Sequence, residues 1–172
     1  MKGLTSDDIR HAFEALAREL PPADSPCELV VVGGAALVLL FEARSSTKDV
    51  DVAIADRVIL DAARRVANQL SLPPDWLNDA AKGYMNGVAP GSVLLATGNL
   101  VVRTLAVQQR LAMKLSAWRD DVDIDDAQLL LGKLLGTKEE VWRLVEPFLV
   151  PGRELKATYA FEDLWEAKNE PE

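Results

Sequence analysis

Residues 28–54 read E-L-V-V-V-G-G-A-A-L-V-L-L-F-E-A-R-S-S-T-K-D-V-D-V-A-I, and this stretch decides the fold. Its first apolar run, Leu29 to Val32, is short and β-branched, which is typical of a buried central strand. Gly33 and Gly34 interrupt the run. Residues 35–43 contain good helix formers and no breaker, so the expected order is strand, glycine turn, helix.

Residues 47–54 alternate between two faces of a second expected strand. Asp49, Asp51 and Ala53 point one way, and the intervening apolar residues point the other. Two carboxylates so close repel each other, and each tends to raise the pKa of the other. A divalent cation would remove this penalty, and Mg2+ prefers carboxylate oxygens together with substrate phosphates. The simpler alternative is an edge strand with a solvated acidic face and no metal.

The two glycines also have two interpretations. The chain contains neither G-x-x-x-x-G-K-[ST] nor G-x-G-x-x-G, so neither a P-loop nor a dinucleotide-binding fingerprint is present. A strand–Gly-Gly–helix turn can still present backbone N–H groups to a phosphate at the start of a helix. Otherwise the glycines provide only a tight turn with positive φ.

Composition limits the class of protein. The chain has 172 residues and a net charge of −8, which disfavours a broad basic surface for nucleic acid. Its single cysteine, Cys27, excludes an internal disulfide. No secretory signal is visible, and the longest apolar stretch falls short of the roughly 20 residues of a membrane span. We therefore expect a cytoplasmic protein with no membrane association.

The rest of the chain indicates a mixed α/β half followed by helices. Residues 76–81 are expected to form a short helix, and residues 93–96 and 100–105 two strands joined by a turn. From residue 106 onward the apolar spacing is helical. The predicted organisation is an α/β core over residues 1–105 and a helical region over residues 106–172.

The glycines and the acidic strand together form a more specific pattern. Val32-Gly33-Gly34-Ala35-Ala36-Leu37, followed by Thr47-Lys48-Asp49-Val50-Asp51-Val52, resembles the signature of the polymerase-β-type nucleotidyltransferase superfamily. The resemblance implies a small mixed sheet flanked by helices and followed by a helical bundle. It also implies that Gly33, Gly34 and Thr47 bind a nucleoside triphosphate (NTP), while Asp49 and Asp51 are catalytic and hold Mg2+ or Mn2+.

A second block lies downstream. Leu111-Ala112-Met113-Lys114-Leu115, then Ala117-Trp118-Arg119 and the Asp123-x-x-Asp126 pair, resemble AbiEii-like nucleotidyltransferases. These are toxin components of abortive-infection and type IV toxin–antitoxin systems. The resemblance implies that Lys114 contacts nucleotide phosphates, that Asp126 is a further catalytic residue, and that an antitoxin protein is the partner. As residues alone, Lys114 can be a snorkelling lysine beside an apolar stripe, and Asp126 can be one of the acids that suit a helix start.

The implied function is Mg2+-dependent transfer of a nucleotide from an NTP to an acceptor hydroxyl on tRNA, a protein or a small molecule. The chain departs from the superfamily pattern, since many catalytic members carry a third carboxylate on a later strand. Residues 100–105 contain no acid, so either Asp79 is the substitute or only two acids hold the metal. Arg44, Lys48 and Arg103 are candidate sources of positive charge. The alternative is an inactive module that binds nucleotide or a protein partner.

Overall fold

The computed structural model describes residues 3–41, 45–119 and 121–169. The chain divides into two compact units. The first comprises Met1–Gly83 and Pro90–Leu105, and the second comprises Tyr84–Ala89 and Ala106–Glu172. None of the helices in the described ranges has the length and apolar content needed to cross a membrane.

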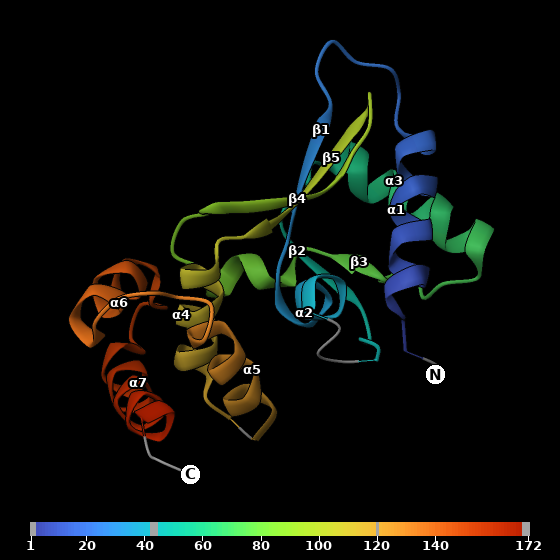
Figure 1. The fold of residues 1–172 in the computed structure, drawn as a ribbon. Helices are drawn as coiled ribbons and strands as arrows, with labels where there is room; N and C mark the ends of the chain where they lie inside the picture. The colour runs from blue at the N-terminus through green and yellow to red at the C-terminus, as the bar shows by residue number, and fades with distance from the viewer. Residues whose placement is uncertain (1–2, 42–44, 120, 170–172) are drawn as a thin grey trace. The chain divides into compact units, whose positions relative to one another are not determined.

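The first unit contains a mixed five-stranded sheet in the order β3-β2-β1-β5-β4 (Figure 1). The central strand pairs antiparallel with β2 and parallel with β5. At the edges, β3 is parallel to β2 and β4 is antiparallel to β5. The strand bounds are β1 Cys27–Val31, β2 Val50–Ile54, β3 Leu77–Asn78, β4 Pro90–Ala96 and β5 Leu100–Leu105.

Helices α1 (Ser6–Glu19), α2 (Gly33–Phe41) and α3 (Arg57–Leu70) flank this sheet. A capping box begins α1, because the Thr5 hydroxyl accepts from the Asp8 N–H at 3.2 Å while the Asp8 carboxylate accepts from the Thr5 N–H at 2.9 Å. Helices α1 and α3 lie side by side, and α2 packs against β2 (Figure 1). The mixed α/β class with flanking helices is confirmed.

The predicted helix over residues 76–81 is wrong. The backbone N–H of Val50 donates to the Trp76 carbonyl at 2.7 Å, and Leu77–Asn78 continues as strand β3. The indole of Trp76 is completely buried and donates to the Ala63 carbonyl at 2.9 Å. Burial of the indole and pairing with β2 therefore override the local helix propensity, and a short 3-10 helix follows at Ala80–Tyr84.

The second unit consists of helices packed around α4 (Val107–Ala117). The other elements are α5 Asp121–Leu131, α6 Lys138–Val145, a 3-10 turn at Glu146–Phe148 and α7 Glu154–Asn169. Residues 84–89 join this unit through the buried side chain of Gln109, which accepts from the Ala89 N–H at 2.6 Å and donates to the Gly87 carbonyl at 2.8 Å.

Candidate functional site

The carboxylate pair lies at the start of β2. Asp49 directly precedes the strand and Asp51 is its second residue. Val50 and Val52 are fully buried, whereas both aspartates are partly exposed, so the predicted alternation holds over these four residues. Ala53 departs from it, because this small apolar residue is buried as well. The pair therefore lies on the less buried face of a strand whose other face is in the core.

The electrostatics of Asp51 show that the two carboxylates interact. Burial raises the pKa of the Asp51 carboxyl, the negative charge of Asp49 raises it further, and a hydrogen bond from Asn78 partly counteracts both effects. Within the described residues, no ion pair involves Asp49 or Asp51. The negative charge of the pair is thus not neutralised by a neighbouring lysine or arginine in the part of the chain that the structure describes.

The glycine turn lies against this pair. Gly33 has φ of +63°, and a Cβ added to it would lie 3.4 Å from the Asp51 Oδ2 atom. The Val32 N–H also donates to the Asp51 carbonyl at 2.9 Å. The predicted positive φ is confirmed at Gly33, whereas Gly34 is an ordinary second residue of α2. The start of α2 and the Asp51 carboxylate therefore adjoin.

Thr47 forms hydrogen bonds in the turn that precedes β2. Its backbone pairs with Leu4 in both directions, at 2.6 Å and 2.9 Å. Its hydroxyl donates to the Asp49 carbonyl at 3.2 Å. The structure thus gives Thr47 a local role in the turn that leads to Asp49.

A second set of charged side chains lies in the helical unit. The Lys114 ammonium contacts the Asp123 Oδ1 atom at 2.9 Å and the Asp126 Oδ2 atom at 2.6 Å. Asp123 also accepts from the backbone N–H and the Nε of Arg119, at 3.1 Å and 3.0 Å. The exposed fractions of the side chains are 16% for Lys114, 2% for Asp123 and 5% for Asp126. The structure therefore brings two of the predicted residues, Lys114 and Asp126, into one buried network that joins α4 to α5.

This network neutralises its acids internally. Burial alone would raise the pKa of Asp123, but the hydrogen bonds from Arg119 and Lys114 outweigh it and lower the pKa to about 2. Asp126 lies beyond the first turn of α5, which holds Asp121 and Asp123. The charge of Lys114, rather than the start of α5, is therefore the direct electrostatic partner of Asp126.

Comparison with known families identifies the class of protein. A family model described as "Nucleotidyltransferase of unknown function (DUF6036)" matches residues 9–132, well over half of the chain. The chain belongs to this nucleotidyltransferase family. The match includes both carboxylate pairs and the glycine turn. No curated protein and no solved structure matches the chain.

The sequence did not predict one residue that adjoins the carboxylate pair. Asn78 lies opposite Asp51 in the parallel pairing of β3 with β2, and its Nδ2 atom donates to the Asp49 Oδ2 atom at 3.4 Å. A strand of two residues has no periodicity that a sequence pattern could reveal. The sequence signal was the Trp76-Leu77-Asn78-Asp79 segment, which gave Asn78 no role of its own.

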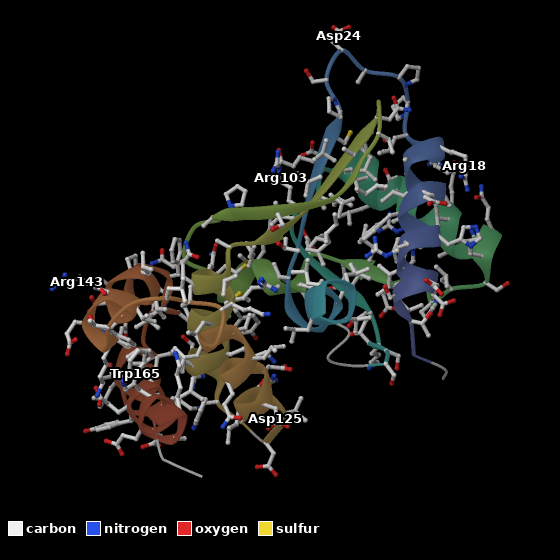
Figure 2. The ribbon with its side chains drawn as sticks, viewed as in Figure 1. Arg18, Asp24, Arg103, Asp125, Arg143 and Trp165 are labelled. Carbon is white, nitrogen blue, oxygen red and sulfur yellow. The ribbon has the colours of Figure 1, made fainter. Side chains whose placement is uncertain are left out.

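Two of the other candidates for charge near the pair, Asp79 and Arg103, have ion-pair partners of their own. Asp79, the expected substitute for a third carboxylate, lies 3.5 Å from the Lys82 ammonium. Arg103 on β5, labelled in Figure 2, pairs with Glu28 at 3.5 Å. Lys48 is exposed, and Arg44 lies outside the described residues.

The carboxylate pair fits a hard divalent cation as a partial ligand set. Among the described residues, no group of three or more His, Cys, Asp and Glu side chains is arranged to hold a metal ion. Mg2+ commonly takes one or two carboxylates and completes its shell with water and substrate phosphates. Asp49 and Asp51 supply oxygen ligands of this type, and Asn78 adds a neutral polar group beside them.

Proposed function

We propose that this nucleotidyltransferase moves a nucleoside monophosphate from an NTP to an acceptor hydroxyl, with Mg2+ or Mn2+ held by Asp49 and Asp51. One observation carries the proposal: Gly33, at the start of α2, is so close to Asp51 that a Cβ there would lie 3.4 Å from the carboxylate. A phosphate-binding helix start and a cation-binding carboxylate are thus adjacent, as a metal–triphosphate substrate requires.

In this proposal, residues of the first unit bind the phosphates and position the carboxylates. The N–H groups at the start of α2 bind phosphate oxygens, and Gly33 leaves room for their close approach. Thr47 keeps Asp49 in place through its hydrogen bond to the Asp49 carbonyl and is a further candidate for the nucleotide. When bound, the cation neutralises charge on the triphosphate and orients it toward the acceptor.

The reaction is a displacement at the α-phosphorus. The acceptor oxygen forms a bond to this phosphorus, and the bond from the phosphorus to the bridging oxygen of the β-phosphate breaks. Pyrophosphate leaves with that oxygen, and the proton of the hydroxyl passes to solvent. Positioning and charge neutralisation supply the rate enhancement, and no oxidant or reductant is needed.

Lys114 and Asp126 enter the proposal through the AbiEii-like resemblance. The Lys114 ammonium has three N–H donors and contacts two carboxylates, so a phosphate oxygen would take the third donor or replace Asp123 or Asp126. The same resemblance supports a toxin whose acceptor is a tRNA end or a protein side chain and whose partner is an antitoxin protein. The net charge of −8 favours an acceptor with a small footprint over an extended RNA surface.

A labelling experiment tests the activity. Purified protein is incubated with Mg2+ and each α-labelled NTP in the presence of separate pools of tRNA, protein and small molecules. We expect label in one pool, and at least a 1,000-fold loss in Asp49→Ala and Asp51→Ala, because removing several kcal/mol of charge stabilisation changes a rate by about this factor. Asp24→Ala is the control, since Figure 2 shows Asp24 in the loop before β1.

The result that contradicts the proposal is equally specific. No labelled product in any pool, or equal labelling by wild type and both aspartate variants, would exclude transfer at this site. Coexpression with a candidate antitoxin separately tests the toxin role, which predicts growth arrest by the wild type alone and relief by the partner or by Asp51→Ala.

A second function is supported by the small ligand set. The described residues place two carboxylates and one neutral amide at the site, a set that suits a module that binds nucleotide without turnover. Calorimetry with an NTP and Mg2+ separates the two functions. Binding that depends on Asp51, without product in any acceptor pool, supports the binding module, whereas product formation supports the enzyme.

A further inference from the structure

The side chain of Asn78 connects two strands at the carboxylate pair. Its Nδ2 atom lies 3.4 Å from the Asp49 Oδ2 atom, and its Oδ1 atom accepts from the Ala80 N–H at 3.1 Å. Asn78 is also the register partner of Asp51 across β2 and β3. One side chain thus adjoins both aspartates.

The orientation of this amide follows from its partners. The backbone N–H of Ala80 can only donate, so the amide atom that faces it must be the oxygen. The NH2 group therefore faces Asp49, and a carboxylate accepts from it. Asn78 presents a hydrogen-bond donor to the pair rather than another negative charge.

The backbone of Asn78 is held firmly. Trp76, two residues earlier, is completely buried, and its indole donates to the Ala63 carbonyl at 2.9 Å. The Trp76 carbonyl accepts from the Val50 N–H at 2.7 Å. These bonds connect β3 to α3 and to the residue between the two aspartates, so the amide of Asn78 is directed at Asp49 from a fixed position.

We propose that Asn78 is the positioning residue of the cation site: its uncharged amide orients the Asp49 carboxylate while the site keeps two negative charges instead of three. This inference rests on the proposed function, since it assumes that Asp49 and Asp51 bind a divalent cation. Groups that hydrogen-bond to metal ligands typically change metal affinity 10- to 100-fold when they are removed.

The spacing of the amide predicts what a charged residue would do there. Two cis ligands at right angles lie about 2.8–3.0 Å apart when each is 2.0–2.1 Å from Mg2+, and about 3.3–3.7 Å apart when each is 2.3–2.6 Å from a larger cation. The observed 3.4 Å between Asn78 and Asp49 lies within the spacing of the larger cation and exceeds the Mg2+ spacing by about 0.5 Å, which a small side-chain rotation closes. An oxygen in place of the Asn78 nitrogen would therefore coordinate the same cation as Asp49.

The test measures Mn2+ binding by the full-length protein in the absence of nucleotide, with free Mn2+ followed by electron paramagnetic resonance. The variants are Asn78→Ala, Asn78→Asp, Asp51→Ala and a control, Asn99→Ala. The control side chain also donates at 3.4 Å, to the Ala17 carbonyl. Its backbone carbonyl accepts from Cys27 at the start of β1, at the opposite end of that strand from Gly33.

We expect the Kd for Mn2+ to rise at least 10-fold in Asn78→Ala, to fall at least 10-fold in Asn78→Asp and to stay unchanged in Asn99→Ala. Circular dichroism checks that each variant is folded. The isosteric Asn78→Asp variant keeps the test decisive if Asn78→Ala unfolds, because a merely structural role predicts no gain in affinity.

Different results would contradict the positioning role of Asn78 and the cation site at Asp49 and Asp51. If the wild type binds Mn2+ through Asp51 and Asn78→Ala has the same Kd, the positioning role is wrong while the cation site stands. If Asn78→Asp binds no more tightly than the wild type, the spacing argument is wrong. If the wild type does not bind Mn2+, or binds it equally without Asp51, the cation site falls and the role of Asn78 falls with it.

Discussion

Two pairs of aspartates in this chain have opposite surroundings. Asp123 and Asp126, on a helix of the second unit, are almost fully buried and share the Lys114 ammonium. Asp49 and Asp51, on a strand of the first unit, are partly exposed and have the neutral Asn78 amide beside them. The pKa of Asp123 is lowered to about 2, whereas burial and Asp49 raise the pKa of Asp51.

The two pairs differ in whether a neighbouring side chain in the described residues supplies the counter-charge. A buried carboxylate is tolerated when the protein supplies its counter-charge, and this neutralisation then contributes to stability. A carboxylate pair without a counter-charge destabilises the fold slightly and gains most from a bound cation. Among the described residues, Lys114 and Arg119 neutralise Asp123 and Asp126, and no lysine or arginine pairs with Asp49 or Asp51, which is the contrast that the proposed cation site requires.

Removing the shared ammonium should have the largest effect on stability. In Lys114→Met, Asp123 and Asp126 lose this partner while remaining buried, and breaking such an interaction costs about 3–5 kcal/mol. Urea denaturation measures the loss. Lys82→Met is the control, because its ion pair with Asp79 is exposed and is worth at most about 1 kcal/mol. Equal stability of the two variants would contradict a structural role for Lys114.

The second-largest expected effect on stability is that of acid on the buried Lys114–Asp123–Asp126 network. Because the pKa of Asp123 falls from an ordinary value of 3.8 to about 2 on folding, its contribution is present above pH 4 and is lost as the pH falls through 2. The shift corresponds to about 2 kcal/mol. The difference in unfolding free energy between wild type and Asp123→Asn should therefore shrink between pH 7 and pH 3. A constant difference would show that Asp123 stabilises by packing alone.

Substitution of Gly33 in the glycine turn should lower the stability by a smaller amount. Gly33→Ala forces an alanine to adopt φ of +63°, which costs about 1–2 kcal/mol, and places a methyl group 3.4 Å from the Asp51 carboxylate. Gly98→Ala is the control, since its φ is not positive and an added Cβ has no atom within 4 Å. Thermal denaturation should separate them. A Gly33→Ala variant as stable as Gly98→Ala would mean that the turn relaxes easily.

The smallest expected change is a gain in stability, from the substitution of Asp51. Without metal, Asp51→Asn removes a partly buried charge and its repulsion from Asp49, and it should raise the unfolding free energy by about 0.5 kcal/mol. Denaturation in EDTA at low salt measures it, and high salt should reduce the gain by screening. Destabilisation by Asp51→Asn in EDTA would remove the electrostatic contrast between the two pairs.

The parts of the site that depend on local pattern could be predicted from the sequence. The alternation around Val50 and the positive φ at Gly33 follow from residue types within a few positions. The position of Asn78 beside the aspartates could not, because it depends on β3 pairing with residues of β2 that lie 27 positions earlier in the chain. The double ion pair of Lys114 likewise requires α5 to pack against α4, which spacing along one helix does not specify.

Trp76 helps to determine which side chain of β3 lies opposite Asp51. Its indole donates a hydrogen bond to the Ala63 carbonyl, and its own carbonyl accepts one from the Val50 N–H. These two bonds fix the register of β3 on β2, in which Asn78 lies opposite Asp51. Displacement of β3 by one residue would place Asp79 there and turn an uncharged neighbour into an anionic one. The number of negative charges beside Asp51 is therefore decided partly by a buried indole, and at the proposed cation site we expect substitutions around Ala63 to change cation affinity without altering Asp49, Asp51 or Asn78.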